Sequence, residues 1–116
     1  MKWSHKREVR ELMPDLVWLH HSPNGGKRDA FVGAQMTALG VKPGFPDLIL
    51  PAPRGSHPGL IIEMKSMAGR ITPKQGTWLA HFEDSGWACF LCRSAEEARE
   101  ELCNYFGLDP ASVPQL

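Results

Sequence analysis

The sequence lacks three features that would each indicate a particular class of protein. It has no run of about 18 apolar residues, the length that a membrane-spanning helix needs. The charged N-terminal segment, residues 1–7, is not followed by the apolar stretch of a secretory signal, so we expect a cytoplasmic protein. The 13 basic and 13 acidic residues balance, so no overall positive charge draws the chain to nucleic acid.

Cysteine is also scarce, with three residues in 116. Cys89 and Cys92 have the C-x-x-C spacing of many metal and redox sites, but they lie in residues 87–92, where we expect a strand. Residues three apart on a strand point to opposite faces of the sheet, so this pair is poorly placed to chelate a metal or to form a disulfide. We therefore expect buried, reduced cysteines.

The charges that are present are distributed unevenly along the chain. Residues 20–74 carry seven Lys or Arg and three Asp or Glu, whereas residues 75–116 carry two and seven. A basic middle segment is what binding to a phosphate backbone needs, and it is equally consistent with a solvated surface that has no partner.

Apolar periodicity predicts one α/β domain over residues 1–116, with a mixed central sheet flanked by helices. Its core is expected from about residue 15 to 107, with an irregular tail over 108–116. Strands are expected at residues 16–20, 47–50, 60–65 and 87–92. Helices are expected before residue 12, from 27 to 40, from 73 to about 85 and from 95 to 106.

Two of the expected helices begin with capping signals. Thr72 suits the N-cap, Pro73 suits the first helical position, and Gln75 completes a capping box. Ser94 and Glu97 have the spacing of a second capping box. The starts of these helices are therefore among the best-defined points in the predicted fold.

The strongest candidate for chemistry is a charged pair at the end of the apolar strand 60–65. Side chains alternate along a strand, so Glu63 and Lys65 project from one face, roughly 7 Å apart. Asp47 follows Pro46 at the start of the preceding strand, and pairing of the two strands would bring Asp47 close to Glu63. The alternative is a surface Glu63–Lys65 ion pair, which would contribute little to stability.

Two neighbouring carboxylates repel each other, and a divalent cation relieves that repulsion. Mg²⁺ is usually held by one or two carboxylates with waters and substrate phosphate, so Asp47, Glu63 and the Met64 backbone carbonyl are candidate ligands. Such a cation polarises a phosphoryl oxygen and lowers the pKa of water, while Lys65 orients that water and stabilises charge on phosphorus. Gln75 is a candidate to contact Lys65, the water or a phosphate, besides its capping role.

Five segments, three of which contain these residues, follow one another in a recognisable order: PNGGKR at 23–28, GVKPGFPDL at 40–48, GLIIEMK at 59–65, GRITPKQ at 69–75 and GW at 86–87. With these landmarks the sequence resembles the PD-(D/E)XK nucleases, and more narrowly the VRR-NUC (virus-type replication-repair nuclease) family. The resemblance runs from about Asp15 to Tyr105, which is most of the chain.

The resemblance implies a restriction-endonuclease-like fold and Mg²⁺- or Mn²⁺-dependent hydrolysis of phosphodiester bonds. It implies that Asp47, Glu63 and Lys65 carry out the reaction, with Gln75 as a further motif residue. Stand-alone viral and bacterial members are similar to Holliday-junction resolvases and act as homodimers. The resemblance therefore favours a homodimeric, structure-selective DNA endonuclease of DNA repair, in which two-fold symmetry places two sites on symmetry-related strands of a junction.

Two alternatives stay open: a nuclease for flaps, 5′ ends or RNA, and an accessory protein that binds nucleic acid without cutting it. The complete set of Asp47, Glu63 and Lys65 argues against a protein that does not cut. The family usually has a glutamate in a longer N-terminal helix. Glu8 and Glu11 are candidates for that position, and each also fits a solvent-facing helix residue.

Polar and basic residues near the expected site are candidates for DNA contact, because phosphate contacts position a duplex without reading its sequence. Each also fits a plain turn or a solvated surface. They are Asn24, Lys27, Arg28, Arg54, Arg70 and Lys74. The histidines at 20, 21 and 57 are expected to be ordinary strand-end or loop residues, because a carboxylate–lysine site does not need them.

Overall fold

The computed structural model describes residues 2–22, 35, 38–39 and 43–116. The turn expected after Ser22 and most of the helix expected from 27 to 40 fall outside the described residues. The same holds for three candidate DNA contacts, Asn24, Lys27 and Arg28.

The strands of the described chain form one four-stranded sheet in the order β1, β2, β3, β4. They are β1 (His20–His21), β2 (Leu48–Leu50), β3 (Leu60–Met64) and β4 (Ala88–Cys92). β2 is antiparallel to both β1 and β3, whereas β3 and β4 are parallel. The mixed sheet that the sequence predicted is therefore confirmed.

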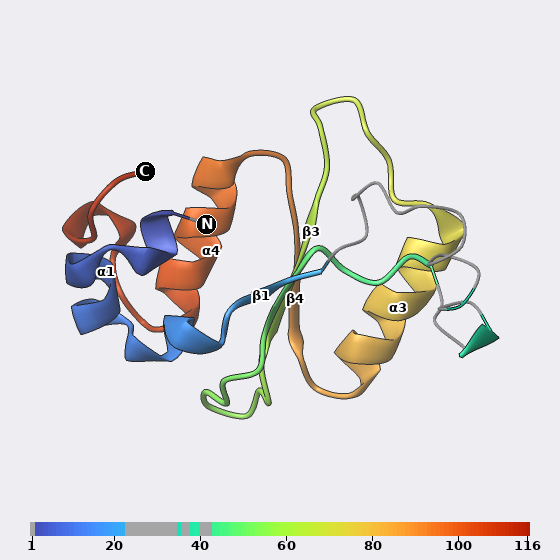
Figure 1. Cartoon of the computed structure of the whole chain (residues 1–116), viewed down its shortest axis with the longest axis horizontal. Coiled ribbons are helices and arrows are strands. Elements are labelled where there is room, and N and C mark those ends of the chain that lie inside the picture. Colours follow the sequence, from blue (N-terminus) through green and yellow to red (C-terminus); the bar gives the residue numbers. More distant parts are fainter. Residues whose placement is uncertain (1, 23–34, 36–37, 40–42) are drawn as a thin grey trace.

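Two of the described helices lie on opposite sides of this sheet, α3 (Pro73–Asp84) and α4 (Ala95–Tyr105), as Figure 1 shows. α3 begins with the expected capping box, in which Thr72 and Gln75 exchange side-chain and backbone hydrogen bonds. At α4 only half of the expected box forms, because the Glu97 carboxylate accepts from the Arg93 N–H. No helix in the described ranges is both long and apolar enough to span a bilayer.

The two faces of β3 contact different layers of the molecule. Leu60 and Ile62 belong to the main core, which lies between the sheet and α4. Glu63 lies on the opposite face, where its side chain meets α3. Residues 60–63 are all buried, as expected for an interior strand with a continuous apolar run. The strand thus places one carboxylate under α3 without disturbing the core on its other face.

The strand expected at residues 16–20 is wrong for most of its length. Pro14–Trp18 forms a 3₁₀ helix, η2, which follows the short helix α1 (Arg7–Leu12), and the chain becomes extended at β1. Leu16 is buried, while Val17 and Trp18 are exposed. A short apolar run does not by itself distinguish a strand from a helical turn, and Pro14 supplies a favourable start for the turn.

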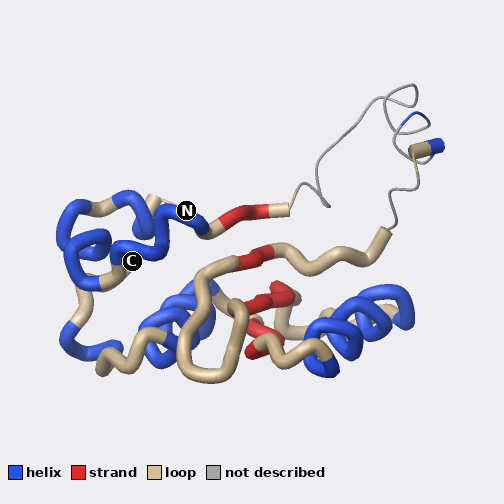
Figure 2. Tube along the Cα trace, turned by 90° about the horizontal axis from the view of Figure 1, so that it is seen from below, coloured by secondary structure: helices blue, strands red, loops and turns tan. Residues whose placement is uncertain are grey.

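The core also extends beyond the expected bounds of residues 15–107. Trp3, the first residue of the 3₁₀ helix η1 (Trp3–His5), belongs to the core, and so does Val113. The segment 108–116 is packed rather than irregular: it contains the 3₁₀ helix η3 (Pro110–Ser112), and Trp3 donates a hydrogen bond to the Pro114 carbonyl at 2.7 Å. The two ends of the chain lie side by side next to α4 (Figures 1 and 2).

Candidate active site

Asp47 is fixed by the strands on both sides of it. The register of β2 with β3 pairs Leu48 with Ile62, so Asp47, one residue earlier, stands opposite Glu63. Asp47 Oδ2 accepts a hydrogen bond from the Met64 N–H at 2.8 Å. Its main-chain carbonyl accepts one from the Ser22 N–H at 2.7 Å, just beyond β1. The carboxylate is thus held in place by three strands of the sheet.

Glu63 is a buried carboxylate with few polar partners. Its side chain is only 1% exposed, and Oε2 has no hydrogen-bond partner in the described part of the chain. Oε1 lies 3.5 Å from Gln75 Nε2, which is long for a hydrogen bond. Burial, and after it the neighbouring Asp47 carboxylate, raises the pKa of Glu63 to about 8, while the positive charge of Lys65 opposes the rise.

Lys65 follows β3 directly and lines the same cavity as Glu63, as the alternation of the strand predicted. Its backbone N–H donates to the Cys92 carbonyl at 2.9 Å, which continues the pairing of β3 with β4 by one residue. Neither of the two ion pairs among the described residues includes Lys65. The residue is half-buried at the wall of the cavity.

Gln75 reaches the site from the first turn of α3, where it has the expected capping role and also lies beside Glu63. Its Oε1 accepts from the Thr72 N–H at 3.0 Å, and its own N–H donates to Thr72 Oγ1 at 3.2 Å. Its Nε2 is directed at Glu63. The capping box holds the amide in this orientation, so the helix start and the site share one side chain.

The cavity between these groups has a volume of about 330 Å³. It is lined by Pro43, Gly44, Phe45, Asp47, Glu63, Met64, Lys65 and Gln75. Gly44 has a φ of +88°, and a Cβ there would lie 2.9 Å from the Lys74 carbonyl carbon. The loop that leads to Asp47 therefore packs this closely on α3 only because residue 44 is glycine.

The chemistry of the site fits a divalent cation. The described residues contain no group of three His, Cys, Asp or Glu side chains that would form a protein-only metal site. Asp47 and Glu63 are the acidic side chains that line this cavity. Two carboxylates, completed by water and substrate oxygens, are a ligand set that Mg²⁺ or Mn²⁺ accepts. A cation would also compensate Glu63 Oε2, which is buried at a cost and has no polar partner among the residues that the structure describes.

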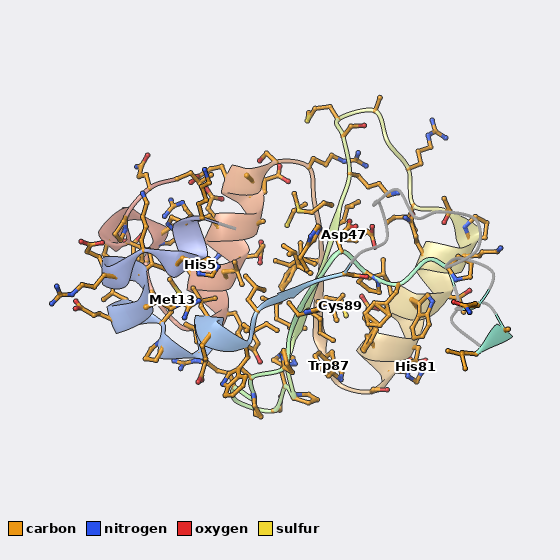
Figure 3. The ribbon with its side chains drawn as sticks, viewed as in Figure 1. His5, Met13, Asp47, His81, Trp87 and Cys89 are labelled. Carbon is orange, nitrogen blue, oxygen red and sulfur yellow. The ribbon has the colours of Figure 1, made fainter. Side chains whose placement is uncertain are left out.

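Neither N-terminal candidate acid lies in this cavity. α1 packs against η1 and η2, beside α4 and away from α3 (Figure 1). Figure 3 likewise places Met13, which follows α1, far from Asp47. Glu8 is exposed, and Glu11 forms an exposed ion pair with Arg7 at 3.0 Å. For both, the interpretation as solvent-facing helix residues is the one that the structure supports.

The other candidates are distributed over several surfaces. Arg70 is exposed in the loop between β3 and α3, and Lys74 is exposed in the first turn of α3 rather than in a loop. Arg54 does not flank the site, because its guanidinium donates to the Phe106 carbonyl at 2.7 Å beside α4. The histidines at 20, 21 and 57 do not line the cavity. Nδ1 of His57 lies 2.7 Å from the Gly86 carbonyl oxygen.

Two residues that shape the site were not among the candidates from sequence. Gly44 has a sequence signal, because a Pro-Gly pair stands shortly before the Pro-Asp pair. The importance of this glycine depends on the close approach of its backbone to α3, which lies about 30 residues later in the chain. Arg93 donates hydrogen bonds to carbonyls in the loop that follows Lys65, 24 to 27 residues earlier in the chain. No local pattern around Arg93 indicates such a contact.

Comparison with known proteins gives consistent results. The family model described as the VRR-NUC domain matches residues 33–96, which include Asp47, Glu63, Lys65 and Gln75. A solved structure called "VRR_NUC domain protein" is 28% identical, with a TM-score of 0.67, and the match covers 87% of this chain and 78% of that chain. No curated protein matches the sequence.

Proposed function

The chain belongs to the VRR-NUC family, whose domain implies a nuclease that acts on DNA, and from this premise we propose a metal-dependent, structure-selective endonuclease. Its favoured substrate is branched DNA, above all a Holliday junction, and its cofactor is Mg²⁺ or Mn²⁺. The observation that supports this proposal best is the convergence of Asp47, Glu63 and Lys65 on one cavity. A binding protein would have no need for a buried carboxylate at that position.

Each side chain has a role that follows from its position. Asp47 and Glu63 are the carboxylate ligands of the cation, and the Met64 carbonyl is the proposed third ligand. When bound, Mg²⁺ or Mn²⁺ supplies a Lewis acid that polarises the phosphoryl oxygen and lowers the pKa of water. Lys65 orients the attacking water and offsets negative charge on phosphorus, while Gln75 holds the Glu63 carboxylate in position.

Substrate binding is assigned to exposed polar and basic residues around the cavity. Arg70 and Lys74 stand before and within the first turn of α3, next to Gln75, so a phosphate backbone that reaches the cavity passes close to both. Such contacts fix the position of the DNA without reading its bases. The proposed contacts Asn24, Lys27 and Arg28 lie outside the described residues.

The test of the proposed function is cutting of four-way junction, flap and linear duplex DNA with Mg²⁺, Mn²⁺ or EDTA. We expect cutting in either metal, none in EDTA, recovery when excess Mg²⁺ is added, and a preference of about tenfold or more for the junction. Binding without cutting would favour the accessory protein instead. Faster cutting of flaps than of junctions would favour the alternative repair nuclease.

A homodimer is part of this proposal, and β4 offers a surface for it. The backbone groups of Ala88 and Cys92 bond toward β3, so those of Cys89 and Leu91 point to the side of β4 where the described sheet has no further strand. Phe90 and Leu91 are 37% and 41% exposed. An apolar edge strand without Lys or Pro is suited to pairing with a second copy of the chain.

The expected result is a solution mass of twice 12.9 kDa at micromolar concentration, measured by light scattering. Leu91→Lys is expected to weaken the dimer about 100-fold, because it places a charge in the apolar contact. Leu12→Lys, at a 45% exposed position on α1, is the matched control and should leave the mass unchanged. A monomeric wild type would contradict the dimer, and a dimer that survives Leu91→Lys would contradict this interface.

A further inference from the structure

The loop of residues 66–71, which connects β3 to α3, projects from the sheet at the top of Figure 1. Arg93 lies in the turn that follows β4, and its Nη1 donates to three carbonyls of this loop. The distances are 2.6 Å to Ser66, 2.7 Å to Gly69 and 3.3 Å to Met67. We call residues 66–71 the clamped loop, because one guanidinium group holds its backbone.

The clamp itself is anchored in the fold. The Arg93 N–H donates to the Glu97 carboxylate in the first turn of α4 at 2.6 Å. The preceding residue, Cys92, accepts from the Lys65 N–H at 2.9 Å. Within the loop, the Gly69 N–H donates to the Ser66 carbonyl at 3.1 Å and closes a turn. The loop that begins directly after Lys65 is therefore tied to β4 and α4 before any DNA arrives.

The side chains around the clamped loop are chemically suited to DNA. Residues 64–75 contain three basic residues, Lys65, Arg70 and Lys74, and no Asp or Glu. Met67 is 80% exposed, although a methionine gains nothing from contact with water. Proteins that hold distorted DNA combine basic side chains on the phosphates with an apolar side chain, methionine among them, inserted between bases.

We propose that the clamped loop is a pre-formed DNA contact in which Met67 inserts into distorted DNA and Arg93 is a positioning residue that keeps the loop in place. The inference rests on the proposed function and adds to it the surface that selects branched DNA. Unstacked bases at a branch admit an apolar side chain at a lower cost than a continuous duplex does. A loop that is already ordered also loses less conformational entropy on binding.

The experiment compares Arg93→Gln, Arg93→Lys and Met67→Ser by their kcat, KM and DNA affinity, with affinity measured by fluorescence anisotropy in EDTA. Arg93→Gln is expected to raise the junction KM about tenfold with kcat within about threefold. Arg93→Lys, which keeps the charge and a nitrogen donor for the loop carbonyls, is expected to recover most of the loss. Met67→Ser is expected to weaken junction binding about fivefold and linear-duplex binding less than twofold. Arg7→Gln removes the same charge from an exposed site on α1 and should leave kcat, KM and DNA affinity unchanged.

The outcomes separate this inference from the function on which it rests. If the wild type cuts no substrate in either metal, the proposed function fails, while the anisotropy comparison still decides the role of the loop. If Arg93→Gln behaves like Arg7→Gln, or if Met67→Ser weakens both DNA forms equally, the inference is wrong. Should Arg93→Gln fail to fold, Met67→Ser changes only an exposed side chain and gives the decision alone.

Discussion

Asp47→Asn is expected to lower the rate of metal-dependent DNA cutting about 1000-fold or more while the protein stays folded. The substitution removes one of two negative charges from the proposed cation site but keeps the size of the side chain. An amide oxygen can still accept the Met64 N–H, which Asp47 Oδ2 accepts at 2.8 Å, so the link between β2 and β3 is preserved. Single-turnover cutting of a four-way junction measures the change.

The control for this substitution is Asp84→Asn at the exposed end of α3, where the same chemical change leaves the cavity untouched. Lys65→Ala should lower the rate by about 100- to 1000-fold, because it removes a positive charge placed to stabilise the transition state. Calorimetric titration with Mn²⁺ should show weaker binding for Asp47→Asn but not for Asp84→Asn. If Asp47→Asn cuts at the wild-type rate, the catalytic site lies elsewhere.

In EDTA, the protein is expected to lose stability as the pH rises from about 4.5 to about 8. Folding raises the pKa of Glu63 from its ordinary value of 4.5 to about 8, first through burial and then through Asp47. Between these two values the folded chain binds more protons than the unfolded chain, so raising the pH favours unfolding. The stabilisation is complete below the ordinary pKa and is lost as the pH passes the folded pKa.

Glu63→Gln is expected to remove this pH dependence and to increase the free energy of unfolding at pH 8 on the order of 2–4 kcal/mol. Urea denaturation at pH 5, 6.5 and 8 measures the effect, with Glu100→Gln, an exposed position on α4, as control. Excess Mg²⁺ should flatten the wild-type profile, because a cation favours the ionised carboxylate. If the wild-type stability in EDTA does not change over this pH range, Glu63 does not have the raised pKa on which this prediction rests.

The elements that the sequence predicted best are those that depend on neighbours within a few residues. The run Leu60–Met64 was identified as a strand from its apolar residues, and Thr72 and Gln75 marked the start of α3 through hydrogen bonds that span one turn. The same local rule, alternation along a strand, placed Glu63 and Lys65 on one face. The strand predicted at residues 16–20 is wrong for most of its length, because a short apolar run fits a helical turn as well as a strand.

The sequence by itself thus determined the strand–helix frame, the identity of the three catalytic candidates and the face that two of them share. The tertiary structure alone decided how strongly Glu63 is buried, how closely the loop at Gly44 approaches α3, and that Arg93 holds the loop after Lys65. The physical reason is the range of the interactions: capping and alternation act between near neighbours, whereas burial and these contacts depend on how distant segments pack together.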